Sequence, residues 1–181
     1  MTGVKMKGGE KLKALLQDIA QKVDHVPTLR VGFLENATYP NGMPVAAVAA
    51  IQEFGAPRAG IPPRPFFRNM IADKEAEWPK AIGQLIKDNN YDIDRAFDLA
   101  GFAIEGQLRQ SIIDTNEPPL SPVTLMIRKM KTEGATITKS SLAIARARLA
   151  SGESVSGVPT KPLVETGHML NSVDHQVVKK A

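Results

Sequence analysis

Four prolines fall within nine residues, PRAGIPPRP from Pro57 to Pro65, and this run restricts the fold more than any other feature. Each proline fixes its own φ angle, lacks an N–H group and moves the preceding residue out of the helical region. We therefore predict an extended segment from Ala56 to Pro65. The elements on either side of it must be separate, and their relative direction is set by a stiff connection.

The sequence before the prolines predicts a helix, a strand and a second helix. Apolar residues at helical spacing indicate the first helix, and Pro27 stops that pattern: Leu12, Leu15, Leu16, Ile19 and Val23. Alternation in TLRVGFL, 28–34, predicts a strand, and NATYPNGMP, 36–44, is dense in turn formers. The Ala-rich VAAVAAIQEF, 45–54, predicts a short helix that ends at Gly55.

The sequence after the prolines predicts mainly helices. One helix starts at Phe66, and Pro79 either kinks it or opens a new one. Asp92 is placed to cap a third, long helix that runs to about Ile112. Ser121 is placed to cap a short basic helix whose first turn holds a proline.

The C-terminal third contains a long stretch without a clear apolar period. Residues 132–160 are rich in Gly, Ser, Thr and small side chains, with one helix-prone island, LAIARARLA. A Thr166-Gly167 turn, one turn of helix and a strand at 173–178 follow, and the strand can pair with 28–34. We therefore expect an α+β fold, a small antiparallel sheet packed against long α-helices. Residues 1–131 and 161–181 would form one core domain, and 132–160 a flexible arm or insertion.

Composition sets limits on the function. A chain of 181 residues with 43% hydrophobic and 23% charged residues is typical of one globular domain. A net charge of +4 is a mild excess, and 5% aromatic residues disfavour a base-stacking surface. The N-terminus has no apolar run long enough for a signal peptide, and no stretch approaches the roughly 18 to 20 apolar residues of a membrane span, so we expect no membrane contact. Zero cysteines exclude disulfides and fit a reducing cytoplasm.

Patterns that carry catalytic or metal chemistry are not apparent. His25, His168 and His175 lie in unrelated segments without metal-ligand spacing, and no nucleophile elbow or phosphate-cradling loop matches. Glu53 has no partner carboxylate at a mechanistic spacing, which favours a structural role. We therefore expect no catalytic residue, metal site or cofactor, and no enzyme activity.

Three ordered motifs carry a family resemblance. VAAIQEFGAPRAGIPPRPFFRNMI at 48–71 resembles the segment in which a short helix ending in Glu-Phe-Gly runs into Ile-Pro-x-Arg-Pro-Phe in the tailed-phage virion-morphogenesis or tail-completion family. LSPVTLMIRK at 120–129 and KPLVETGHMLNSV at 161–173 resemble its later elements. The 132–160 insertion and the short C-terminal end depart from the simpler family pattern, which leaves the station within the neck open.

The resemblance implies a structural virion protein at the head–tail junction, made in the bacterial cytoplasm and assembled into a homo-oligomeric ring. Its partners would be neck, connector or tail proteins, with nonspecific contact to packaged DNA. We expect the interface to include these residues: Glu53, Phe54, Ile61, Arg64, Phe66, Leu142, Ala145 and Leu149. Phe54 and Phe66 would also insert into the core. Arg146 and Arg148 would be solvated surface charges or, if their segment lines a DNA channel, would face DNA. The alternatives are a small basic DNA-binding or channel-lining module and, with less support, a small hydrolase.

Overall fold

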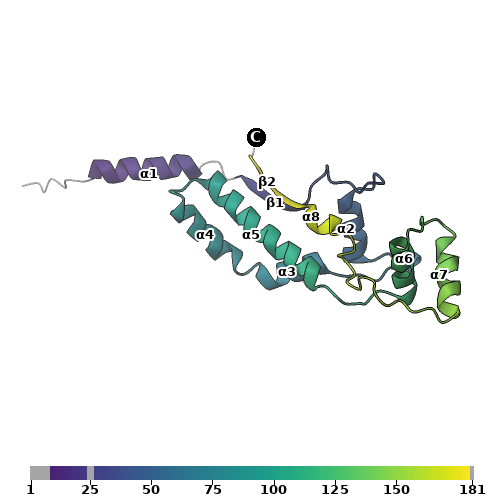
Figure 1. The fold of residues 1–181 in the computed structure, drawn as a ribbon. Coiled ribbons are helices and arrows are strands. Elements are labelled where there is room, and N and C mark those ends of the chain that lie inside the picture. The colour runs from purple at the N-terminus through teal and green to yellow at the C-terminus, as the bar shows by residue number, and fades with distance from the viewer. Residues whose placement is uncertain (1–8, 24–26, 180–181) are drawn as a thin grey trace, which may run out of the picture.

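The computed structural model describes residues 9–23 and 27–179. It confirms the α+β class, with a small two-stranded sheet beside long helices (Figure 1). In chain order the elements are α1 (Gly9–Val23), β1 (Thr28–Phe33), α2 (Val45–Phe54), a 3₁₀ turn (Pro57–Ala59), α3 (Phe66–Lys74), α4 (Trp78–Asp88), α5 (Ile93–Asp114), α6 (Pro122–Thr132), α7 (Ser141–Ala150), α8 (His168–Asn171) and β2 (Val173–Val178).

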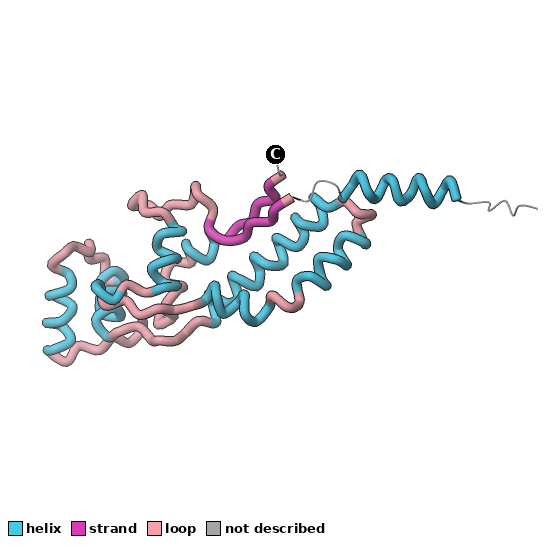
Figure 2. The backbone as a smooth tube through the Cα atoms, turned by 180° about the vertical axis from the view of Figure 1, so that it is seen from behind, coloured by secondary structure: helices cyan, strands magenta, loops and turns pink. Residues whose placement is uncertain are grey.

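The molecule is elongated. Helix α1 projects from one end, α6 and α7 form the other end, and the sheet with α2 to α5 lies between them (Figure 1). Seen from behind, long loops connect the α6–α7 end to the central body (Figure 2). Among the described helices, none has the combination of length and apolarity that crossing a membrane requires.

The two strands come from opposite ends of the chain. Thr28 pairs with Val178 and Phe33 with Val173, in antiparallel register, which confirms the predicted pairing. The strands lie against α5, the longest helix. Asp92 caps α5 as predicted, because its side chain accepts the backbone N–H of Arg95 at 3.0 Å. This arrangement fixes the C-terminal strand across the middle of the body.

The main core lies where α2, α3, α5 and the start of β2 meet. Phe66 is its largest fully buried side chain, with 1% of its surface exposed. Eight further buried residues complete this cluster: Val45, Ala49, Met70, Leu108, Ile112, Leu163, Met169 and Val173. Pro79 lies in the first turn of α4, so of the two predicted outcomes it opens a new helix. The proline segment departs from the prediction at one point, because residues 57–59 form a 3₁₀ turn rather than an extended chain.

A second, smaller cluster joins α6 and α7. Ser121 caps α6 as predicted, accepting the backbone N–H of Thr124 at 3.2 Å. Met126, Met130 and Ala145 are buried between the two helices. Residues 132–160 therefore contain a helix, α7, that packs on α6. The sequence shows no strong apolar period there because the buried residue of α7 in this cluster is the small Ala145. The boundary expected at 131 separates two helices that share one cluster, and the mobility of 132–160 stays a prediction.

Candidate interaction surfaces

Glu53 connects the end of α2 to the start of α3. Its carboxylate accepts the backbone N–H groups of Phe67 at 2.9 Å and Arg68 at 3.2 Å. The Arg68 side chain adds an ion pair of 2.8 Å to the same carboxylate. Glu53 is 5% exposed, so a buried carboxylate satisfies the unpaired N–H groups of a helix N-terminus. This is the structural role expected for it, and it fixes the angle between the two helices.

Gly55 and Phe54 follow directly. A Cβ at Gly55 would lie 2.8 Å from the Pro63 nitrogen, and its φ of 74° also favours glycine, so the proline segment packs tightly on the end of α2. The core position predicted for Phe54 is wrong, because its side chain is 64% exposed. The buried positions of α2 are Val45, Ala49 and Glu53, and the next residue points about 100° away from that face.

Phe54 borders an apolar pocket of about 270 Å³ on the surface formed by α2, α3 and β1. The Arg68 guanidinium lies over the Phe54 ring, 5.1 Å from its centroid, and so holds the ring at the rim. Apolar side chains line the floor and walls: Phe33, Ala46, Ala49, Ala50, Phe66 and Phe67. Only Glu53 and Arg68 contribute charge, and each is paired with the other. This surface, the Phe54 pocket, suits an apolar side chain.

Helix α1 presents a second apolar surface. Leu12, Leu15 and Leu16 are 58%, 55% and 56% exposed, and they share one face of the helix. The hydrogen bond recorded between α1 and the body runs from the Lys22 ammonium to the Asn90 carbonyl, at 3.4 Å. Figure 1 shows the helix extending away from the body. The predicted helix is confirmed, and its apolar face, the leucine face, has no cover among the described residues.

Two buried arginines lie at a pair of adjoining crevices between the body and α6: Arg128 lines both, and Arg64 lines the larger one. Arg64, 4% exposed, donates to the Pro118 carbonyl at 3.1 Å and to the Gln52 side chain at 3.2 Å. Arg128, 5% exposed, donates to the carbonyls of Pro159, Lys161 and Pro162. The crevices measure about 790 and 380 Å³. These arginines hold the loops that connect the two ends of the molecule.

The arginine pair carries an electrostatic cost. Burial lowers the pKa of Arg64, and the positive charge of Arg128 lowers it further. Burial also lowers the pKa of Arg128, while the Glu165 carboxylate raises it. That carboxylate lies 3.6 Å from the Arg128 Nε, which is buried and has no hydrogen-bond partner among the described residues. Arg64 and Glu53, both predicted as interface residues, are thus buried. Any effect of theirs on a partner would be indirect, through the surface residues that they hold in place.

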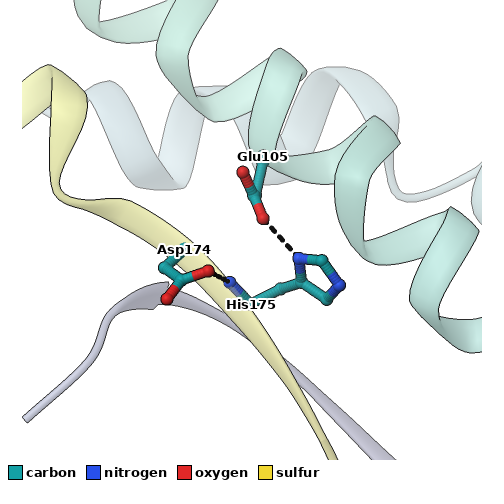
Figure 3. A group of neighbouring side chains, drawn as sticks. All are labelled: Glu105, Asp174 and His175. Atoms are coloured by element: carbon teal, nitrogen blue, oxygen red, sulfur yellow. Dashed lines mark hydrogen bonds and ion pairs between the residues drawn. The ribbon is translucent and has the colours of Figure 1, made fainter.

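A buried charge cluster fixes β2 to α5 (Figure 3). The His175 ring donates to or accepts from Glu105 through Nδ1, and its Nε2 lies 3.1 Å from Asp98. The Arg109 guanidinium forms an ion pair with the other carboxylate oxygen of Glu105, at 2.6 Å. Burial lowers the pKa of His175, but the hydrogen bonds and negative charges of Glu105 and Asp98 outweigh it and raise the pKa above 6.5. Phe102 meets the His175 ring edge-on, with centroids 4.6 Å apart.

Two members of this cluster, with the neighbouring Asp174, form a candidate metal centre. Ligand atoms of Glu105, Asp174 and His175 lie within 4.8 Å of one another. Folding thus brings His175 beside Glu105, which is remote in sequence, and Asp174, whose adjacent position is not a metal-ligand spacing. The Asp174 carboxylate, however, accepts the backbone N–H of His175, and Arg109 places a positive charge on Glu105. A divalent cation would have to displace that guanidinium. We therefore interpret the cluster as a structural ion network.

The remaining predicted residues are scattered. Ala145 is fully buried and Leu149 packs beside it on α6, whereas Leu142 is 43% exposed. Arg148 pairs with Glu133 at 2.8 Å and with Glu153 at 2.7 Å, and these side-chain hydrogen bonds raise its pKa. Ile61 is half-buried at the proline segment, forming a bridge with Ala56, and Arg146 is exposed. The DNA-facing role of Arg146 and Arg148 stays a prediction.

The other two histidines do not join a common site. His168 stacks on Tyr39, with ring centroids 4.6 Å apart, and its Nε2 lies 2.9 Å from the Thr38 carbonyl oxygen. These contacts fix the start of α8 to the loop after β1. His25 lies outside the described residues.

Sequence reasoning missed the charged residues on the face of α5. Asp98, Glu105 and Arg109 follow one another at intervals of seven and four, which places them on a single helix face with Gly101. Two acids and a base aligned on one helix face are placed to form ion pairs with a segment that packs on that face, which here is β2. That signal was available, but the identity of its partner, His175, depended on the fold.

Comparison with known proteins adds no relative. A scan against protein-family models, a search of curated proteins and a search of solved structures each found no match.

Proposed function

We propose that this protein is a structural subunit of a tailed bacteriophage particle. It assembles with further copies into a ring at the head–tail junction and joins the tail to the head through contacts with neck, connector or tail proteins. It is made in the host cytoplasm and acts in the virion, and no catalytic step is part of its role.

The exposed leucine face of α1 carries this proposal. An isolated helix of 15 residues is only marginally stable in water, and most helices are stabilised by packing an apolar face. Leu12, Leu15 and Leu16 are each more than half exposed, so none of the residues that the structure describes supplies that packing, and another chain can supply it. A chain that presents such a helix is built to assemble, and the three ordered motifs described above indicate which assembly.

The charge distribution supports assembly over the DNA-binding alternative. Arg148, on the basic helix α7, is paired with Glu133 and Glu153. Lys129 and Lys131 of α6 are paired with Glu153 and Glu165, each at 2.8 Å. Lys and Arg side chains bind DNA by displacing the counterions condensed on its phosphates, and cations already paired with carboxylates contribute less to this binding.

Deleting the gene from the phage that carries it tests the proposal. We expect filled heads and free or unfinished tails, seen by negative-stain electron microscopy, with infectivity restored by the gene in trans. Restoration should fail for Leu12→Ser/Leu15→Ser/Leu16→Ser and succeed for Ile144→Ser, a matched control on a different helix with a 46% exposed side chain. Normal joined particles without the protein would contradict the proposal.

A further inference from the structure

The structure leaves two apolar surfaces uncovered, the leucine face of α1 and the Phe54 pocket. The first is convex, a ridge of leucines on a helix about 22 Å long at about 1.5 Å per residue. The second is concave, with alanines and phenylalanines around about 270 Å³. Large exposed apolar patches mark interaction sites in soluble proteins. A leucine ridge and an apolar hollow are complementary in both shape and chemistry.

The two surfaces cannot cover each other within one chain. Helix α1 extends from the end of the body nearest the start of α5, whereas α2 and α3, which form the pocket, lie toward the opposite end (Figure 1). The Lys22 contact to Asn90 keeps the root of α1 at its own end of the body. The helix therefore reaches a pocket only on a neighbouring molecule.

Pairing of α1 with another α1 accounts for the surfaces less well. Sustained coiled coils need about three to four heptads, and α1 has 15 residues, about two. Such a pair would bury little compared with the roughly 800 Å² per partner of a stable interface, and it would leave Phe54 exposed. A helix that lies across α2 and α3 would bury its leucines against both of these helices and would also cover the exposed Phe54 ring.

We propose that α1 of one copy docks by its leucine face in the Phe54 pocket of the next copy. The contact joins two different surfaces, so each subunit both donates a helix and accepts one. A heterologous contact of this kind produces a closed ring when its rotation closes and an open filament when it does not. This inference rests on the proposed function and adds the contact that builds the ring. Glu53 and Arg68 act indirectly, since their ion pair holds Phe54 at the rim.

Disulfide crosslinking tests the contact, because the chain has no cysteine of its own. The double variant Leu15→Cys/Ala50→Cys places one thiol on the leucine face and one on the exposed wall of the pocket. Under mild oxidation we expect a ladder of covalent dimers, trimers and larger species on a non-reducing gel. Each single-cysteine variant is a matched control and should run as a monomer on the same gel, because it cannot form a disulfide across the proposed contact. Dimers from Leu15→Cys alone, as abundant as those of the double variant, would overturn the proposal in favour of helix self-pairing.

Mixing two defective variants gives a second test. Leu12→Ser/Leu15→Ser/Leu16→Ser loses the donor surface, and Phe54→Ser loses the acceptor. The triple variant should self-associate at least about a hundredfold more weakly than the parent, and Phe54→Ser at least about tenfold more weakly, since each buried large apolar side chain contributes about a tenfold or larger change in affinity. Mixed, they retain one intact donor and one intact acceptor, so native mass spectrometry should find a 1:1 dimer that does not grow. Absence of that dimer would overturn the proposal.

The outcomes separate this inference from the proposed function. If the parent chain forms a ring but the double-cysteine variant gives no ladder, the ring stands and its contact is a different one. If the parent chain stays monomeric at every concentration, both the ring and the contact are refuted. Circular dichroism and thermal melting of each variant show that the fold is intact, as expected for substitutions of exposed side chains.

Discussion

The central body and the α6–α7 end are built in different ways. The hydrophobic core cluster of the body has nine buried members, drawn from sequence positions as far apart as Val45 and Val173, so it forms only when distant parts of the chain are in place. The cluster of the α6–α7 end has three buried members, Met126, Met130 and Ala145, all from two helices that are neighbours in sequence. Local contacts form without long loop closure, and small clusters also open at a lower free energy. The central body and the α6–α7 end should therefore differ in how cooperatively they unfold.

Ion pairs do not remove this difference. Lys129 and Arg148 meet Glu153 on the surface of the α6–α7 end, but exposed pairs typically contribute under about 1 kcal/mol each. Arg128 is the exception, because it is buried and donates to three backbone carbonyls of the loop at 159–162. The smaller unit is connected to the body mainly through that arginine and Arg64.

Truncating the main core should have the largest effect. Phe66→Ala removes the largest fully buried side chain, and such a change typically costs about 3 to 5 kcal/mol. Because the core joins both ends of the chain, we expect the whole body to unfold at a lower temperature, which calorimetry measures. A melting temperature within a degree or two of the parent would show that the proline segment does not direct Phe66 into the core.

Truncating the smaller cluster should have a local effect. Met126→Ala removes a fully buried side chain at the α6–α7 contact, and we expect about 2 kcal/mol, because methionine clusters adapt more readily than aromatic ones. Hydrogen exchange should accelerate in α6 and α7 while the amides of α5 keep their protection. Equal acceleration in α5 would refute the comparison, and it would make the chain one cooperative unit.

The charge cluster between α5 and β2 lies in the central body and should make the stability of that body depend on pH. The pKa of His175 is raised in the folded state by Glu105 and Asp98, with Arg109 and Asp174 also adjacent. A raised pKa gives stability that is fully present below the unfolded value near 6.5 and is lost as pH rises through the folded value. The free energy of unfolding of the parent, minus that of His175→Gln, should therefore fall as pH increases.

Urea titrations from about pH 5 upward measure this difference, because the carboxylates with ordinary pKa values near 4 stay ionised there. His168→Gln is the matched control, because its ring lies against Tyr39 and a backbone carbonyl rather than in the charge cluster. A difference for His175 that is constant over the whole range would show that the ring stays neutral in the cluster.

Much of the secondary structure was predictable because the deciding signals are local. Asp92 and Ser121 cap the helices that they precede, and the alternating residues at 28–33 form the expected strand. Each of these depends on a side chain within a few residues of the backbone it fixes. The same reasoning placed the α+β class and the pairing of the first strand with the last.

The interaction surfaces were less predictable because they depend on direction. Phe54 and Phe66 flank the same prolines, yet one is exposed and the other is buried. Phe54 is exposed because Glu53, the preceding residue, lies on the buried face of α2 and its carboxylate caps α3. Likewise, the packing of α7 on α6 was not predicted, because Ala145 contributes little apolar signal in the sequence although it is buried against Met126 and Met130.

The narrow seat of His175 on α5 constrains how this protein can evolve. A Cβ at Gly101 would lie 2.1 Å from the imidazole ring, within the space of the ring itself. A methyl group at Gly101 therefore forces the ring out of its place between Glu105 and Asp98, whereas a smaller residue at position 175 would leave room for it. The two positions form an epistatic pair, so the order in which they mutate determines which sequences a lineage can reach.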